Sequence, residues 1–175
     1  MSEKVLPLFD HMSVKPNEVI FTLLFNACAK LADADAAKIG KDALKRLPIA
    51  YLDDVILVNA AIDMMMKSGD VSHAERLFST MKKPSIYTYG ALMKGYTLND
   101  EPTKCLQLFN EIEQQKFILD EPIYMSLVNA CSQIGIISRC RRVTNHIPPK
   151  FQSGVRMKTA LIDMWVSNIS VHPCC

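Results

Sequence analysis

The sequence predicts an all-α protein, a right-handed α-solenoid of stacked antiparallel helix pairs. Two phrases recur at nearly the same distance along the chain: N-A-C-A-K-L at 26–31 returns as N-A-C-S-Q-I at 129–134, and A-A-I-D-M-M-M at 60–66 returns as A-L-I-D-M-W-V at 160–166. Apolar residues follow helical spacing in nearly every segment, and no segment alternates with the period of two that strands require. Because one short helix pair cannot bury its apolar face alone, repeated pairs are expected to stack.

Four apolar stripes place consecutive helices between residues 55 and 120. Their members are spaced by three or four residues, with occasional adjacent pairs, which puts them on one face of a helix. The stripes are Val58, Ile62 and Met65, then Val71, Ala74, Leu77, Phe78 and Met81, then Tyr89, Leu92, Met93 and Tyr96, and finally Cys105, Leu108, Phe109 and Ile112. The spacing predicts helices of about 11–13 residues, with a new pair every 31 to 37 residues or so.

Turn and capping residues separate these helices. S-G-D forms a turn in which Asp70 is a candidate N-cap, and Ser72 with Glu75 offers a capping box as an alternative start. N-D-E-P is expected to do the same, with Asp100 as the cap and Pro102 in the first turn, where a missing N–H costs little. K-K-P-S and I-P-P-K are expected to end helices.

Length and composition fit one globular domain. The chain has 175 residues, of which 49% are apolar, so a disordered chain is excluded. A formal net charge of +2 permits an anionic partner without arguing strongly for one. The charge is uneven, because residues 122–162 contain no Asp or Glu. The basic residues of that stretch are Arg139, Arg141, Arg142, Lys150, Arg156 and Lys158. They predict either a solvated basic face or a surface that contacts phosphates.

Cysteine spacing argues against a structural zinc site. No two of the cysteines form a C-x-x-C pair. Cys28, Cys105 and Cys131 lie in apolar helical patterns, where a free thiol behaves as a small hydrophobe, so a reducing compartment fits best. No apolar run approaches the roughly 20 residues that span a bilayer, and the first residues lack a signal or transit pattern. We therefore expect no membrane partner.

The repeated phrases resemble the pentatricopeptide repeat family, and in particular its P-L-S arrangement from plant organelles. N-A-C-A-K-L and N-A-C-S-Q-I are similar to the first helices of two L-type repeats. An S-type repeat is resembled by residues 55–81, V-I-L-V-N-A-A-I-D-M-M-M-K-S-G-D-V-S-H-A-E-R-L-F-S-T-M. The start of a P-type repeat is resembled by I-Y-T-Y-G-A-L-M-K-G-Y. The resemblance implies a partial P repeat at 1–17, an L repeat at 18–54, an S repeat at 55–85, a P repeat at 86–120, an L repeat at 121–154 and a truncated S repeat at 155–175. Since both terminal repeats are incomplete, the chain is expected to be a fragment.

The resemblance also implies a partner, single-stranded RNA, bound at roughly one base per repeat. In this family the fifth residue of each repeat contacts the base edge, helped by the last residue of the repeat. The fifth positions are Thr22, Asn59, Gly90, Met125 and Thr159. The closing residues are Asp54, Ser85, Asp120 and, in poor register, Gly154. The family trend then favours guanine at Thr22 with Asp54 and a pyrimidine at Asn59 with Ser85.

Two fifth positions depart from the pattern, since Gly90 has no side chain and Met125 offers only apolar contact, so their repeats are interpreted as spacers. The alternative for Thr22 and Asn59 is a solvent-facing polar residue on a helix. Three aromatic residues each precede a fifth position by one residue. These are Phe21, Tyr89 and Tyr124, and we expect them in the core between helices, although stacking on bases is the alternative.

No catalytic residue and no cofactor are expected in this chain. Many P-L-S proteins carry a deaminase-like domain whose zinc is held within H-x-E and P-C-x-x-C motifs. Here His73-Ala74-Glu75 should lie on a repeat helix whose Ala74 packs inward, and Pro173-Cys174-Cys175 lacks the spacer, so we reject this match. A deaminase domain in a longer parent protein stays open.

Three functional hypotheses follow. The first is a monomeric module that binds a site in organellar transcripts for modification such as C-to-U editing, with other editing or processing proteins as further partners. Mitochondria or plastids are implied by the resemblance alone. The second is a protein–protein interaction scaffold, since helical solenoids also bind peptides. The third is a non-functional truncated remnant, which predicts exposed apolar faces near residues 5–12 and 161–166.

Overall fold

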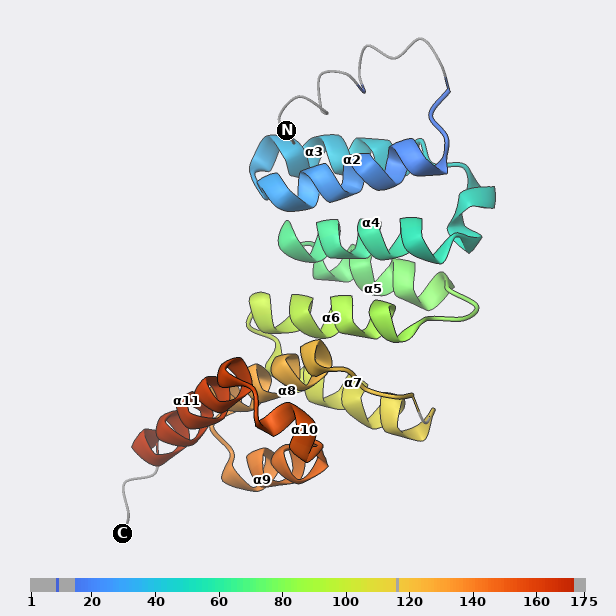
Figure 1. Ribbon diagram of the computed structural model, residues 1–175. Helices are drawn as coiled ribbons and strands as arrows, with labels where there is room; N and C mark the ends of the chain where they lie inside the picture. Colours follow the sequence, from blue (N-terminus) through green and yellow to red (C-terminus); the bar gives the residue numbers. More distant parts are fainter. Residues whose placement is uncertain (1–8, 10–14, 116, 172–175) are drawn as a thin grey trace. The chain divides into compact units, whose positions relative to one another are not determined.

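A computed structural model describes residue 9 and residues 15–115 and 117–171 of the chain. Within these residues all regular structure is helical and there is no strand, as the sequence predicts. The chain divides into two compact units, residues 1–95 and 96–175, with the division inside one helix (Figure 1). Among the described helices, none is both long enough and apolar enough to cross a bilayer.

The described residues of unit 1 include two complete helix pairs and the start of a third. Its elements are α2 (Glu18–Leu31), α3 (Ala34–Lys45), the short 3₁₀ helix η1 (Ile49–Asp53), α4 (Val55–Lys67), α5 (Val71–Thr80) and the first part of α6 (Ile86–Leu98). Only two residues separate α2 from α3 and three separate α4 from α5, so each pair folds back on itself (Figure 1). The short connections explain why the pairs are antiparallel.

Carboxylate and amide side chains start the helices of unit 1. Asn17 Oδ1 accepts a hydrogen bond from Ile20 N at the start of α2, and Asp33 Oδ1 accepts one from Ala36 N at the start of α3. Each bond satisfies a backbone donor that the helix itself leaves unpaired. Asp70 caps α5, which confirms the first of the two predicted starts.

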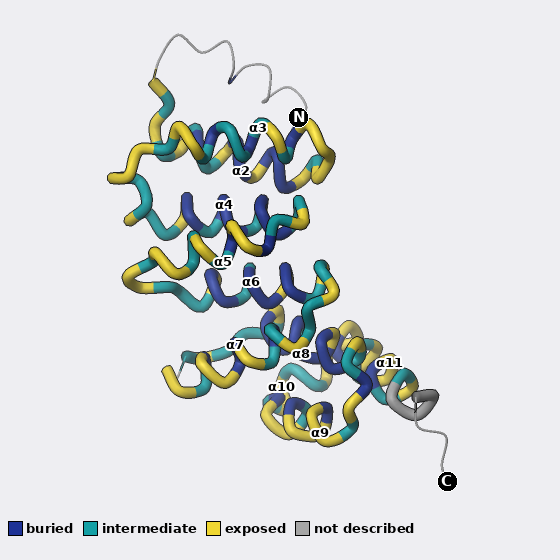
Figure 2. The backbone as a smooth tube through the Cα atoms, turned by 180° about the vertical axis from the view of Figure 1, so that it is seen from behind, coloured by how far each residue is buried: buried dark blue, intermediate teal, exposed yellow. Residues whose placement is uncertain are grey.

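The core of unit 1 lies where α2 and α4 pack together. Phe21 and Phe25 of α2 are buried with their rings 6.2 Å apart, and the three consecutive methionines at 64–66 of α4 are each 1% exposed. Figure 2 shows buried positions recurring along α4. Full burial of such a side chain stabilises the fold by roughly 1.5–3 kcal/mol, so this layer fixes the stacking of successive repeats.

Two glycines let backbones approach these methionines. A Cβ atom added at Gly40 of α3 would lie 2.8 Å from Met64 Sδ and Cε, and one added at Gly95 of α6 would lie 2.3 Å from Met66 Cγ. Both distances are shorter than real contacts permit. Gly95 is therefore needed for the close approach of α6 to α4, because Met66 Cβ is fixed by its backbone, whereas the end of Met64 beside Gly40 can move.

Unit 2 repeats the same plan. It contains the end of α6, followed by α7 (Pro102–Gln114), α8 (Glu121–Ile134), α9 (Ile137–His146), the single-turn α10 (Pro149–Gln152) and α11 (Val155–Val171). α8 packs against both α7 and α11. Side chains of Leu127, Cys131, Met157 and Met164 are fully buried, which makes α8 the centre of this unit.

The sequence prediction missed η1 and α10, which occupy equivalent places in the two repeats expected to be of L type. Tyr51 of η1 lies 6.3 Å from the ring of Phe21, and Phe151 of α10 lies 5.7 Å from the ring of Tyr124. In both repeats the aromatic ring of the single turn packs on the buried aromatic residue of the first helix of the same repeat. A single turn is too short to show a periodic pattern, so neither element could be predicted from spacing.

The predicted cap of α7 was wrong. Glu101 is the N-cap residue and makes no capping bond with its side chain, whereas Asp100 has φ 55°. Asp100 therefore adopts the left-handed conformation that ends α6, a role that Asp tolerates better than most residues. Pro102 does lie in the first turn of α7, as expected.

Core predictions for single residues are mostly confirmed. Phe21, Tyr89 and Tyr124 are buried, with exposed fractions of 2%, 2% and 6%, which rules out base stacking by these rings in this arrangement. The buried thiols include Cys28, Cys105 and Cys131, as predicted, and also Cys140. In the segment 161–166, Ile162 and Val166 are about 60% exposed, as expected of an uncovered face, whereas Met164 is fully buried. Phe9 is 8% exposed and its ring lies 5.8 Å from that of Phe21, so the expected exposed face near residues 5–12 is wrong at this position; residues 5–8 and 10–12 lie outside the described residues.

Candidate nucleic-acid interface

The fifth positions all lie on the first helices of the pairs. Thr22 is on α2, Asn59 on α4, Gly90 on α6, Met125 on α8 and Thr159 on α11. Thr159 is exposed and the other four are half-buried, so none belongs to the core. These positions therefore border the apolar layer without being part of it.

The two threonines present oxygen acceptors. Thr22 Oγ1 donates its hydrogen to Glu18 O at 2.8 Å, and Thr159 Oγ1 donates to Val155 O at 3.0 Å. Each hydroxyl proton is therefore engaged by the preceding helical turn. The lone pairs of both oxygens stay available, so either residue can accept a hydrogen bond from a ligand.

Asn59 has an unsatisfied amide. Its Oδ1 atom is buried and has no hydrogen-bond partner among the described residues. A buried polar atom without a partner destabilises a fold by about 1–3 kcal/mol. Rotation of the Asn59 side chain toward a ligand that donates a hydrogen bond would remove this penalty, so the residue is suited to binding.

The closing residues serve as helix caps. Asp54 Oδ1 accepts from Ile56 N at 2.8 Å and starts α4, and Asp120 Oδ1 accepts from Ile123 N at 3.3 Å and starts α8. Capping by itself explains an Asp at these positions, because it stabilises a helix start by about 1 kcal/mol. The capping bonds use one carboxylate oxygen, Oδ1, in each residue.

Ser85 forms a reciprocal cap with a buried threonine. Thr88 N donates to Ser85 Oγ at 3.3 Å, and Ser85 N donates to Thr88 Oγ1 at 3.0 Å. Thr88 is fully buried, so this pair secures the start of α6. Gly154 is exposed directly before α11, and a Cβ there would meet no close neighbour, so its backbone does not require glycine.

Two of the predicted positions share one groove in unit 2. A groove of about 410 Å³ between α8 and α11, here the α8–α11 groove, brings Met125 and Thr159 together. It is lined by Met125, Asn129, Ser132, Val155, Arg156, Thr159, Ala160 and Asp163. Its size is within the range of small-molecule sites, about 300–1,000 Å³. The predicted spacer Met125 thus lies in a polar and charged setting.

Three exposed apolar side chains accompany the fifth positions. Val19, Ile56 and Tyr87 are 63%, 72% and 73% exposed, and each precedes a fifth position by three residues. Residues three apart lie on the same helix face, so each apolar side chain neighbours Thr22, Asn59 or Gly90. This row was not predicted, although the spacing of three residues to each fifth position is present in the sequence.

The basic residues of the acid-free stretch lie on three helices, α9, α10 and α11. On α9, Arg142 Nη2 lies 3.0 Å from both Glu113 Oε2 and Asn110 Oδ1, so its charge is compensated. On α11, Arg156 lines the α8–α11 groove. Among these two arginines, Arg156 is therefore the better candidate for a phosphate contact.

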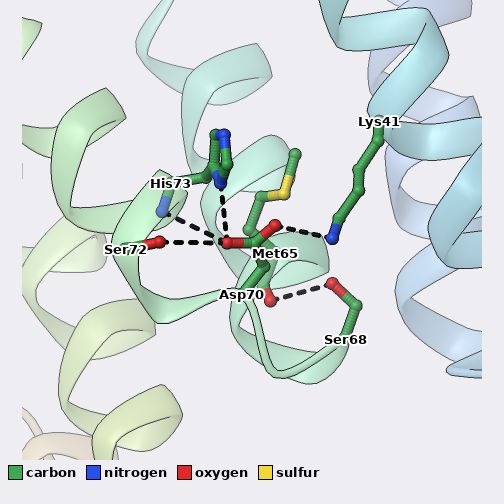
Figure 3. Close-up of polar contacts among 6 residues, drawn as sticks. All are labelled: Lys41, Met65, Ser68, Asp70, Ser72 and His73. Atoms are coloured by element: carbon green, nitrogen blue, oxygen red, sulfur yellow. Dashed lines mark hydrogen bonds and ion pairs between the residues drawn. The ribbon is translucent and has the colours of Figure 1, made fainter.

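His73 and Glu75, which matched one part of a deaminase motif, lie on α5. His73 Nδ1 is 2.7 Å from Asp70 Oδ1, and the same carboxylate pairs with Lys41 of α3 (Figure 3). Burial works to raise the pKa of Asp70, but hydrogen bonds from Lys41 and His73 outweigh it and hold this pKa at about 2. Within the described residues, no three His, Cys, Asp or Glu side chains come together to hold a metal ion, and residues 173–175 lie outside this part.

Comparison with known proteins finds similarity to one family. A model described as the PPR repeat matches residues 56–85 and 87–117. The Arabidopsis thaliana "Pentatricopeptide repeat-containing protein At3g20730" is 30% identical over 125 residues, which are 71% of this chain and 22% of that protein. The chloroplastic At1g74600 protein of the same plant is 25% identical over 92% of this chain and 18% of its own length. The chain thus spans about a fifth of these relatives.

Solved structures share the fold. The maize pentatricopeptide repeat protein PPR10, in complex with an 18-nucleotide psaJ RNA element, superposes with a TM-score of 0.67 at 20% identity, over 97% of this chain and 25% of that one. The PPR domain of Arabidopsis thaliana protein-only RNase P 1, in complex with tRNA, has a TM-score of 0.72 at 14% identity, over 94% of this chain and 90% of that one. Both likenesses confirm the α-solenoid fold class predicted from the sequence.

Proposed function

Because the chain contains pentatricopeptide repeats at residues 56–85 and 87–117, we propose that it is a module that binds single-stranded RNA. The first helices of the pairs carry the binding residues. The two solved structures in complex with RNA have the same fold, which supports the proposal. The α8–α11 groove gives further support. Met125 and Thr159 come from separate repeats, and both line this groove together with the guanidinium group of Arg156.

In unit 1 we propose that Thr22 and Asn59 contact the edges of neighbouring bases. α2 and α4 pack directly on one another, so the two side chains come from adjacent helices. The Thr22 oxygen can accept from guanine, whose Watson–Crick edge presents two donors, and the Asn59 amide can pair with a pyrimidine. Asp54 would assist through Oδ2, the carboxylate oxygen that its capping bonds do not use, and Ser85 through the hydroxyl oxygen that also caps α6.

The exposed row of Val19, Ile56 and Tyr87 supplies apolar surface for the bases. The flat face of a base can pack on such a side chain. The edge of the same base then reaches the fifth position, which lies one helical turn further along the helix. The same row also fits an apolar peptide, which makes a protein–protein interaction scaffold the second candidate. Gly90, which offers no hydrogen bond at a fifth position, favours that alternative for the third repeat.

The role of the whole protein is a finer proposal. We infer that the module selects a site in a mitochondrial or plastid transcript for processing such as C-to-U editing, with other processing proteins supplying the chemistry. The relatives named as chloroplastic and mitochondrial support an organellar location. The P-L-S order and the repeat boundaries at 18–54, 55–85, 86–120 and 121–154 belong to the same proposal.

The direct test is an equilibrium titration of the chain with a fluorescent single-stranded RNA pool and with duplex RNA across a range of salt concentrations. Single strands should bind more tightly than duplexes, and affinity should fall as salt rises because phosphate contacts release counterions. Equal binding of both forms, or no binding at low salt, contradicts RNA recognition. A protein partner that survives nuclease treatment in a pull-down would then support the scaffold.

A further inference from the structure

We propose that the α8–α11 groove binds a guanine nucleotide through Asn129, Asp163 and Arg156, so that the repeat of Met125 recognises a base and is not a spacer. This inference rests on the proposed function and names the chemistry of one of its sites. The residues that contact the base are then Asn129 and Asp163, which lie one helical turn after the fifth positions of α8 and α11.

The geometry brings these residues to one site. Asn129 follows Met125 by four residues on α8, and Asp163 follows Thr159 by four residues on α11. Residues four apart lie on the same face of a helix. All four line the α8–α11 groove, together with Arg156 from the first turn of α11. Asn129 of α8 therefore faces the same space as Arg156 and Asp163 of α11.

The three proposed side chains are available. No hydrogen bond or ion pair to Asn129, Arg156 or Asp163 side chains is present in the described part of the chain, and all three residues are exposed. Arg142 and Asp70, by contrast, are engaged in ion pairs. The groove thus holds one donor cation, one acceptor anion and one amide that a ligand can engage without breaking an internal contact.

Hydrogen-bond chemistry selects the base. A carboxylate such as Asp163 only accepts hydrogen bonds, and guanine presents two adjacent donors, N1–H and the N2 amino group. Uracil has a single N3–H donor between two carbonyl oxygens, which the negative carboxylate repels. Cytosine and adenine each place an acceptor nitrogen beside their amino group. The Asn129 amide can in addition donate to O6 of guanine, so guanine satisfies both side chains.

Arg156 is placed for the phosphate. Seven residues separate Arg156 from Asp163, which is about 10 Å along the helix axis, so one small group cannot engage both. A nucleotide carries its phosphate and its base edge at opposite ends. The guanidinium group matches phosphate oxygens in a two-bond arrangement, and the start of a helix adds positive potential there. Met125 and Ala160 then provide apolar contact for the ring between the two ends.

The experiment is a selection from a randomised single-stranded RNA pool with the full chain, followed by titration of the enriched sequence and of the same sequence with the enriched guanine replaced by uracil. The variants are Asp163→Asn, Asn129→Ala and Arg156→Gln. Lys158→Gln is the matched control, because Lys158 is an exposed cation on α11 that does not line the groove. The helical circular dichroism signal and unfolding midpoint of each variant confirm that it is folded.

We expect Asp163→Asn and Asn129→Ala to reduce the guanine-over-uracil preference at one position of the enriched sequence by at least about fivefold. Arg156→Gln should weaken binding to both sequences equally and lower the salt slope by about one. Lys158→Gln should leave the base preference unchanged.

Two outcomes would overturn the inference and differ in what else they affect. If single-stranded RNA binds but the enriched sequence is the same for Asp163→Asn and Asn129→Ala as for the parent, recognition does not involve Asn129 and Asp163, and the proposed function stands. If no single-stranded RNA is bound at all, the proposed function and this inference fail together.

Discussion

The Lys41 ammonium group of α3 lies 2.6 Å from the Asp70 carboxylate that caps α5, so one side chain joins two successive helix pairs (Figure 3). Asp70 also accepts from His73 N and contacts His73 Nδ1. The side chain of Asp70 is only 13% exposed, which protects these contacts from solvent screening. This carboxylate therefore connects α3 to α5 and also starts α5.

We expect Asp70→Asn to destabilise the protein at neutral pH. The folded-state pKa of about 2 is below the ordinary value of 3.8, so the ionised form stabilises the fold above pH 4 and this contribution is lost as the pH falls from about 4 to about 2. The shift corresponds to at most about 2 kcal/mol. Urea unfolding at pH 7 should show a loss of about 1–2 kcal/mol for the variant, and at pH 2 almost none.

The control for this prediction is Asp53→Asn. Asp53 pairs with Lys82 at 3.0 Å, but both side chains are more than 70% exposed. Surface pairs of this kind contribute little, so the variant should lie within about 0.5 kcal/mol of the parent at both pH values. An Asp70→Asn loss no larger than that of Asp53→Asn would show that the buried contact does not join the pairs.

Gly95→Ala should destabilise unit 1 more than Gly40→Ala. The new methyl group at residue 95 would meet Met66 at Cγ and Cβ, and Cβ cannot move without shifting α4, so overpacking of about 1–3 kcal/mol is expected. At residue 40 it would meet mainly the flexible end of Met64, and alanine also favours the helix. Thermal unfolding compares the two variants, and equal midpoints would contradict the close approach of α6 to α4.

The buried thiols should be unreactive in the folded protein. Burial raises the pKa of Cys28 to about 11 and that of Cys105 to about 12, and burial together with nearby Cys140 raises the pKa of Cys131. Because the thiolate is the reactive form, an aromatic disulfide reagent at pH 8 should label none of these thiols until urea is added. A Cys174→Ser, Cys175→Ser background removes the remaining cysteines, and rapid labelling of the folded chain would contradict the packing.

Much of the fold was predictable because helical periodicity is a local signal. The aromatic residues Phe21, Tyr89 and Tyr124 repeat at one register and are all buried, since the same face of each first helix meets its neighbours. Single turns such as α10 carry no period and were missed. The cap at Asp100 was assigned from residue type alone, and only the backbone conformation distinguishes a helix end from a helix start.

The candidate site was predictable only in part. Repeat register places Met125 and Thr159 on first helices, but it does not show that Asn129, Arg156 and Asp163 line the same groove. Those residues lie on two helices that are about 30 positions apart in the sequence, so they come together only because α8 and α11 pack against each other. The capping bonds of Asp54, Ser85 and Asp120 depend likewise on where each helix begins.

Substitutions at the fifth positions of unit 1 should alter base preference more than total affinity. Thr22→Ala removes an oxygen acceptor and Asn59→Ala removes the unsatisfied amide, so each should change the preferred base at one position by about fivefold while the pool affinity changes less than about threefold. Ser79→Ala on the exposed side of α5 is the control. Unchanged preferences in both variants would remove these two residues from the interface.

The central claim is that the first helices of the pairs bind single-stranded RNA, and crosslinking tests it most directly. Single-stranded RNA is irradiated with the full chain, and the crosslinked peptides are located by mass spectrometry. We predict crosslinks within α2, α4, α8 and α11, with competition by unlabelled single strands and not by duplex RNA. Crosslinks confined to α3, α5 and the basic helix α9, or equal competition by duplex RNA, would contradict the claim.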